Sequence, residues 1–171
     1  MSFLREAEYQ SVVDALVRIG NQLNAPSLRF SKGAAIAMAM EKATKYRLKY
    51  VDQEGYDCID LETGTKYELK STADMFTNNL ITGRVSVSNT NKSTFAQTFD
   101  YLLCIQSTPS KFAIAQLTWN ECDQNLDRSK PGQFNLNHKL PVTNWICRNC
   151  TIVKDLPLAP LDMRKMLESA L

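Results

Sequence analysis

Apolar residues near the start of the chain recur at the spacing of an α-helix. Val12, Leu16, Ile19 and Leu23 fall at i, i+4, i+7 and i+11, so that they form one stripe along a helix. The pattern predicts an amphipathic helix over residues 4–24, with an Asn-Ala-Pro sequence that stops it.

A second helix is expected to begin at Ser31, an N-cap residue, and to continue to residue 48. Its many Ala and Met side chains favour close approach by another helix, as at a packing or dimer surface. The hydrophobic period then changes to two, which is typical of strands. We predict strands over residues 45–51, 56–61, 66–71, 83–89, 100–107, 111–119 and 144–153.

The remaining stretches of the chain complete the set of predicted elements and indicate the fold class. Short helices are predicted at residues 92–99 and 160–171, and residues 72–81 and 120–140 are expected to be polar and irregular. Helices thus precede a β-meander, and further strands and short helices follow it. This order predicts an α+β fold with a mixed central β-sheet and flanking helices. The 171 residues are enough for one domain with its own core.

Composition and charge narrow the function classes. The chain is 44% hydrophobic and 22% charged, with a net charge of +2, which argues against a polyanion binder that relies on bulk charge. A local excess of +4 lies between Lys32 and Lys49. It fits either a solvated helix face or a flank that contacts phosphates. The N-terminus lacks the pattern of a signal peptide, so we expect a cytoplasmic protein.

Cysteine and histidine chemistry is not favoured. The five cysteines have no secretory context that would predict a disulfide framework. Cys147 and Cys150 form a single C-x-x-C pair, and Cys122 and His138 complete no familiar zinc pattern. The lone histidine, His138, is expected in a polar surface loop.

The strongest chemical signal is the stretch "GYDCIDLETGTKYELKS", residues 55–71. Alternation places Glu68 and Lys70 on one face of the second strand of a hairpin, and a carboxylate of the first strand can meet them there. Two adjacent carboxylates repel each other, and a divalent cation removes that repulsion. Ligation by oxygen alone suits Mg²⁺.

Two aspartates compete for the place opposite Glu68. Asp57 and Asp60 are three residues apart and point to opposite faces of a regular strand, so only one of them faces Glu68 unless a bulge intervenes. We favour Asp57 and keep Asp60 as the alternative. Glu41, on the second helix, is either an auxiliary acid of this site or a solvated charge.

The pattern "EGYD…YELKS" over residues 54–71 resembles the active-site hairpin of the PD-(D/E)XK nucleases, in particular of the small PvuII-like type II restriction endonucleases. Tyr56 takes the place of the proline in the motif's name, and the turn before "YELK" is slightly longer. The resemblance implies that Asp57 and Glu68 bind Mg²⁺ together with the backbone carbonyl of Leu69. It implies Lys70 as the catalytic lysine, beside Asp57 and Glu68.

The resemblance also implies a fold, a partner and an organisation of the chain. Residues 1–171 would form one restriction-endonuclease-like domain that cuts double-stranded DNA. Residues 1–50 would carry the dimerisation helices, residues 51–120 the catalytic core and residues 121–171 the C-terminal sheet edge and helix. A palindromic DNA site implies a two-fold homodimer.

DNA bases would be read by short polar side chains that follow the hairpin. The histidines that PvuII-like enzymes use there are absent from this stretch, so the recognised bases are not predicted. The candidates are Asn78, Asn79, Arg84, Ser86, Ser88, Asn89, Asn91 and Lys92. A second candidate region, within residues 120–139, holds Asn125, Arg128, Lys130 and Asn137.

Three functions compete at this point. The first is a Mg²⁺-dependent type II restriction endonuclease. The second is a structure-specific or repair nuclease, such as a junction resolvase, although such enzymes are usually more basic than the pI of about 8.2 found here. The third is a non-catalytic DNA-binding module in which the hairpin charges are only solvated.

Overall fold

The computed structural model describes the chain in segments. They are residues 4–23, 32–53, 55–72, 75–82, 85–87, 97–107, 112–127, 129, 134–136 and 139–150. The predicted helix at 160–171 and most of the predicted helix at 92–99 lie outside these residues. None of the helices in the described segments is long and apolar enough to cross a membrane.

Two helices form the N-terminal part of the structure. Helix α1 spans Glu6–Leu23 and helix α2 spans Lys32–Ala43. The predicted stripe is confirmed where side chains are described, since Val12 and Leu16 are fully buried. Helix α2 ends earlier than predicted because Lys45 and Tyr46 adopt left-handed backbone, with φ of 52° and 66°.

A mixed sheet of six strands forms the centre of the molecule, in the order β1-β2-β3-β7-β8-β12. Strands β3 and β7 pair in parallel, and the other neighbours pair antiparallel. The strands are β1 (Leu48–Gln53), β2 (Tyr56–Asp60), β3 (Lys66–Thr72), β7 (Tyr101–Ser107), β8 (Phe112–Thr118) and β12 (Trp145–Cys150). The predicted α+β class with a mixed sheet and flanking helices is therefore confirmed.

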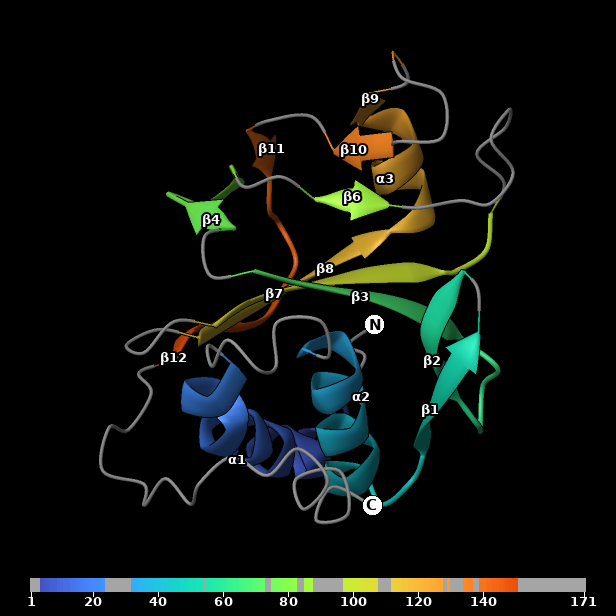
Figure 1. Cartoon of the computed structure of the whole chain (residues 1–171), viewed down its shortest axis with the longest axis vertical. Coiled ribbons are helices and arrows are strands. Elements are labelled where there is room, and N and C mark those ends of the chain that lie inside the picture. Colours follow the sequence, from blue (N-terminus) through green and yellow to red (C-terminus); the bar gives the residue numbers. More distant parts are fainter. Residues whose placement is uncertain are drawn as a thin grey trace.

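The sheet separates two hydrophobic layers. Helices α1 and α2 cover one face, whereas short strands and helix α3 lie over the other (Figure 1). Leu69 and Leu103 point toward the helices, and Leu102 and Cys104 point toward the opposite layer. Because neighbouring positions alternate between faces, Glu68 and Lys70 point away from α1 and α2.

The layer opposite α1 and α2 departs most from the predicted elements. Residues 72–81, expected to be irregular, contain a hairpin, and residues 120–140 contain helix α3 and two short strands. Residues 97–99, predicted to be helical, form no helix. The short elements of this layer are β4 (Phe76–Thr77), β5 (Leu80–Ile81), β6 (Ser86–Val87), α3 (Trp119–Gln124), β9 (Leu126–Asp127), β10 (Phe134–Leu136) and β11 (Leu140–Pro141).

These short strands form two small sheets, ordered β6-β10-β9 and β11-β5-β4. Strands β4, β5 and β6 all lie on the connection between β3 and β7 along the chain. A parallel pair cannot be joined by a tight turn, so this connection has to cross one face of the sheet. Its Met75, Ile81 and Val85 are buried against that face, which brings the connection close to the face that carries Glu68 and Lys70.

Candidate metal and phosphodiester site

The β2–β3 hairpin brings Asp57 to Glu68. Cys58 pairs with Tyr67 and Ile59 pairs with Lys66, so the same antiparallel register places Asp57 opposite Glu68. The regular pairing stops at Cys58 and Tyr67. Instead of a ladder bond, the side chain of Asp57 accepts a hydrogen bond at Oδ2 from the backbone N–H of Leu69, at 2.7 Å.

This hydrogen bond also orients the carbonyl of Leu69. In a strand the N–H and C=O of one residue point toward the same neighbouring strand. Since the N–H of Leu69 is directed to Asp57, its carbonyl oxygen faces β2 as well. Two carboxylates and one carbonyl are thus gathered where β2 and β3 separate.

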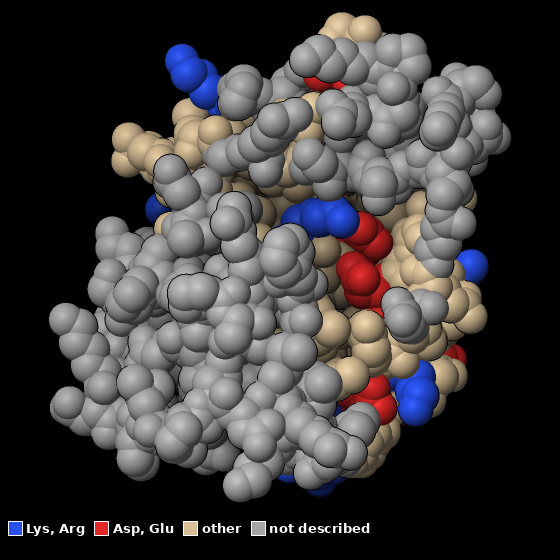
Figure 2. Space-filling model, viewed as in Figure 1, with Lys and Arg blue, Asp and Glu red and all other residues tan. Residues whose placement is uncertain are grey.

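Lys70 lies beside the acidic pair. Its Nζ is 2.5 Å from Oε1 of Glu68, and its side chain is 28% exposed, against 11% for Glu68. In Figure 2 a basic group lies against two acidic groups in a recess near the centre of the visible face, where β2 and β3 run in Figure 1. The cluster therefore combines buried negative charge with a cation that reaches solvent.

Burial raises the pKa of Glu68 above its ordinary value of 4.5. The ammonium of Lys70 opposes this effect, while the neighbouring carboxylate of Asp57 adds to it. A carboxyl group with a raised pKa is costly to ionise. A cation that binds between Asp57 and Glu68 would reduce that cost.

Asp60, the alternative partner, is engaged elsewhere. It forms a buried ion pair with Arg47, and its Oδ1 accepts a hydrogen bond from the backbone N–H of Glu62 at 2.8 Å. Arg47 also donates from Nε to Oε1 of Glu8 at 2.7 Å. Asp60 therefore links the hairpin to α1, and Asp57 is the aspartate beside Glu68.

Glu41 is also engaged elsewhere. The carboxylate is buried and accepts a hydrogen bond at Oε2 from the backbone N–H of Tyr50, at 2.9 Å. Lys49 lies 3.5 Å from its other oxygen. Glu41 thus satisfies a backbone donor inside strand β1 and is not simply a solvated charge, one of the two alternatives that the sequence left open.

The oxygen donors at this site are of the kind that Mg²⁺ prefers. In the described segments no group of three or more His, Cys, Asp or Glu side chains is placed to hold a metal ion. Asp57 and Glu68 provide two carboxylates, and the carbonyl of Leu69 faces the same side. All three donors are hard oxygens, and Mg²⁺ commonly binds through one or two carboxylates and keeps several waters. The residues present fit such an ion.

The predicted DNA-reading residues are only partly described. Asn78 and Asn79 form the turn between β4 and β5, with φ of 49° and 67°. They border a cavity of about 370 Å³ together with Gln106 and Arg148. Sequence reasoning missed Gln106 and Arg148, because they follow no motif. The backbone of Ser86 lies in β6, opposite Asn135 of β10. Predicted positions outside the described residues are Arg84, Ser88, Asn89, Asn91 and Lys92.

The second predicted reading region is not a plain loop. Asn125 ends helix α3, and its Nδ2 donates to the backbone oxygen of Glu121 at 2.8 Å, so it acts as a helix cap. Arg128, Lys130, Asn137 and His138 lie outside the described residues.

The cysteines of the described segments are buried thiols: Cys58, Cys104, Cys122 and Cys147. Burial raises the pKa of Cys122 to about 12, and it also raises the pKa of Cys58 and Cys104. Thiols of this kind are poor nucleophiles at neutral pH. The side chain of Cys150 is outside the described part of the chain.

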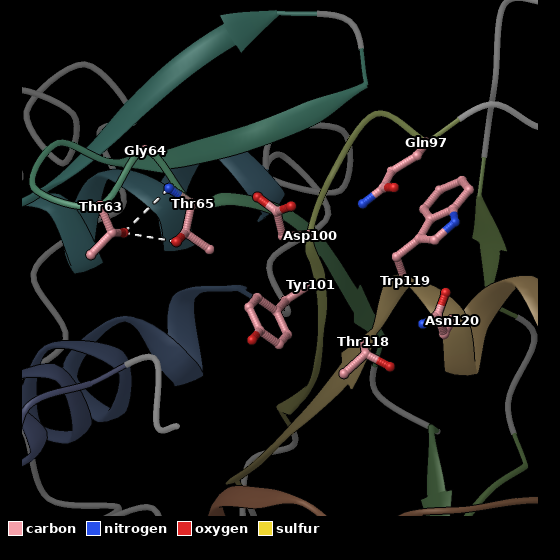
Figure 3. Close-up of a pocket in the computed structure, with 9 residues that line it drawn as sticks. All are labelled: Thr63, Gly64, Thr65, Gln97, Asp100, Tyr101, Thr118, Trp119 and Asn120. Atoms are coloured by element: carbon pink, nitrogen blue, oxygen red, sulfur yellow. Dashed lines mark hydrogen bonds between the residues drawn. The ribbon is translucent and has the colours of Figure 1, made fainter.

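A further cavity of about 520 Å³ lies at the other end of β3 and β7. In Figure 3 Thr63 and Thr65 of the β2–β3 turn lie on one side of it and Trp119 on the other, with Asp100 between them. Asp100 accepts a hydrogen bond from the backbone N–H of Lys66 at 2.8 Å. The walls of this cavity include none of Asp57, Glu68 and Lys70, so the cavity is separate from the acidic pair.

Comparisons of the chain with models of protein families, with curated proteins and with solved structures found no match. The fold is thus described by its α+β class and its mixed six-stranded sheet.

Proposed function

We propose that the protein is a Mg²⁺-dependent type II restriction endonuclease of the PD-(D/E)XK kind, which hydrolyses phosphodiester bonds of double-stranded DNA at a short specific site. The observation that supports this most is the convergence of Asp57, Glu68 and Lys70 on one side of the sheet. The resemblance of residues 54–71 to the nuclease hairpin supports the same function.

The three side chains have distinct roles in this proposal. Asp57 and Glu68, with the carbonyl of Leu69, would hold Mg²⁺. When bound, the ion supplies positive charge against the charge that develops on the phosphate and makes water more acidic. Lys70 is partly exposed and lies at the rim of the acidic pair, so its ammonium would contact the phosphate or the attacking water and orient it.

Specific cleavage of both strands further requires two copies of the site. We propose a homodimer whose contact includes residues 1–50, so that one two-fold axis relates the two acidic pairs. The described part of this region, α1 and α2, packs on the sheet face opposite Glu68 and Lys70.

The first experiment incubates plasmid DNA of known sequence with the protein and Mg²⁺. Discrete fragments with ends that map to one sequence are expected. Cutting of branched DNA alone would favour a structure-specific nuclease instead. Absence of any cutting, with DNA still bound, would favour a non-catalytic DNA-binding module.

Substitutions then connect the activity to the site. Lys70→Ala is expected to reduce cleavage about 10³-fold and to keep specific binding in Ca²⁺. Lys66→Ala removes a lysine from the same strand, outside the acidic cluster, and serves as the matched control. Normal cleavage by the Lys70 variant would exclude its catalytic role. Calorimetry should show Mg²⁺ binding that Glu68→Ala abolishes and Glu62→Ala leaves intact.

A further inference from the structure

The cavity beside Asn78 and Asn79 lies on the same face of the sheet as the acidic site. Lys70 is level with Cys104 in the parallel pair of β3 and β7, and Thr72 is level with Gln106. Positions two apart share a face, so Gln106 points to the same side as Lys70. Gln106 is therefore two residues further along the sheet than Lys70 and one strand over, which puts the two positions about 8 Å apart.

The side chain of Gln106 can only donate a hydrogen bond into this cavity. Its Oε1 already accepts hydrogen bonds from the backbone N–H groups of Phe76, at 2.7 Å, and Met75, at 3.3 Å. These two contacts fix the orientation of the amide. Its NH₂ group is then left for the cavity that Gln106 borders.

A register shift in β12 brings Arg148 to the same cavity. Trp145 and Arg148 are three residues apart and would point to opposite faces of a regular strand, but the pairing with β8 shifts between Trp145 and Cys147. The guanidinium of Arg148 lies 5.4 Å from the centre of the Trp145 ring. That ring packs edge-on against Phe76, at 4.8 Å, and this contact supports the arginine over the cavity.

The described residues that border the cavity include one positive charge, that of Arg148, and no negative charge. No acidic side chain borders it among the described residues, and none of them forms an ion pair with Arg148. An exposed guanidinium and a fixed amide NH₂ are both donors. They match a ligand that only accepts hydrogen bonds.

We infer that Arg148 and Gln106 form a second DNA anchor, which binds a non-bridging oxygen of a phosphodiester close to the scissile one. This inference rests on the proposed function. A phosphate is favoured over a base edge because the two donors come from different strands, β12 and β7, and can approach one tetrahedral group from two sides. Adenine would require an acceptor as well as a donor, and Gln106 has its acceptor in use; the edge of guanine also presents only acceptors, and the test below separates it from a phosphate.

The test measures binding to a fluorescent duplex that carries the mapped cleavage site, in Ca²⁺ and at increasing salt. Arg148→Gln is expected to weaken binding about tenfold at low salt. The slope of log K against log salt should decrease in magnitude by about one. Lys66→Gln removes a positive charge that does not border the cavity and lies outside the proposed dimer contact, so it should change neither quantity.

Gln106→Glu is the second variant. A glutamate keeps the acceptor for Met75 and Phe76, so the fold is retained, but it replaces the donor with a negative charge. Binding should weaken at least as much as in Arg148→Gln. Thermal unfolding checks that both variants fold. If Gln106→Glu does not fold, the test rests on Arg148→Gln, which should fold because the side chain of Arg148 is exposed.

A methylphosphonate at one backbone position distinguishes a phosphate from a base. At the anchored position this neutral group should weaken wild-type binding and leave binding by Arg148→Gln unchanged. If wild-type protein cuts DNA and both variants bind normally, the anchor is wrong and the proposed function stands. A loss confined to one base-pair substitution would assign Arg148 to base reading and overturn the phosphate assignment. A wild-type protein that neither binds nor cuts DNA would overturn both.

Discussion

The buried ion pairs of Arg47 lead to a quantitative prediction for Arg47→Met. Its side chain is only 7% exposed and contacts two carboxylates, those of Asp60 and Glu8, which are 7% and 13% exposed. The methionine fills a similar space with no charge, so the two carboxylates lose their common partner. The substitution isolates an interaction that joins α1 to the hairpin that carries Asp57 and Glu68.

The magnitude follows from the contacts. Arg47 donates from Nε at 2.7 Å and from Nη2 at 2.5 Å to Glu8, and from Nη1 to Asp60. A hydrogen bond to a charged group contributes about 1.5–3 kcal/mol. The three are not additive, and removal of one partner from a buried pair costs about 3–5 kcal/mol. We therefore expect the free energy of unfolding to fall by about 4 kcal/mol, a large fraction of the total for one domain.

The assay is urea unfolding at neutral pH, with Arg5→Met as the control. Arg5 also pairs with a glutamate, Glu62, but both side chains are 55% exposed, so its loss should cost less than about 1 kcal/mol. Equal losses in the two variants would refute the reasoning, because burial is what separates them.

The pH dependence of Arg47→Met is a second check. Burial alone would raise the pKa of Glu8, but the hydrogen bond and charge of Arg47 lower it below 4.5. The pair therefore stabilises the fold above that pH and loses its effect as the pH falls through the lowered pKa. The difference between wild type and variant should shrink in acid. A constant difference would contradict the ion-pair explanation.

Two more predictions concern the β2–β3 hairpin and the turn that precedes it. Without metal, Glu68→Gln should raise the unfolding temperature at neutral pH. Burial and the charge of Asp57 raise the pKa of Glu68, so ionisation of this carboxyl group costs stability above pH 4.5. The gain from the substitution should therefore vanish below that pH. A loss of stability in thermal unfolding at neutral pH with EDTA would contradict this. Gly55→Ala should cost about 3 kcal/mol in urea unfolding, since φ is +98° and a Cβ would lie 2.6 Å from that of Thr98. Gly64→Ala, with φ of +74° and open space, should cost only about 1 kcal/mol, and equal losses would show that the contact is unimportant.

Sequence periodicity predicted the long elements well. The stripe of α1 and the strands β2, β3, β7 and β8 were expected within a few residues, because each buries a regular apolar face. Alternation and a short turn predicted that a carboxylate of the first strand meets Glu68, and the register of the hairpin brings Asp57 to that place. What sequence alone left open was Asp57 against Asp60. That choice depends on Arg47, whose ion pair with Asp60 was not visible in any local pattern.

The short elements were missed for two reasons. Thr118, the N-cap of helix α3, and Glu121 in its first turn form a reciprocal capping box, which is a signal present in the sequence. The β4–β5 hairpin has the two-residue turn Asn78-Asn79 with positive φ at both positions, another signal present in the sequence. By contrast, the position of Arg148 depends on a shift in the pairing of β12 with β8, and no spacing predicts such a shift.

The pairing of β3 with β7 places the acids, the lysine and the donors on one face. Positions that lie level on the two strands point to the same face, so alternate positions of both strands form one continuous row. Glu68 and Lys70 come from β3, and Gln106 continues the row from β7. The connection that the parallel pair requires then brings β4 and β5 over the end of that row, with Asn78 and Asn79 at their turn. A DNA strand that followed this row would meet the acidic pair first and the proposed Arg148 anchor next.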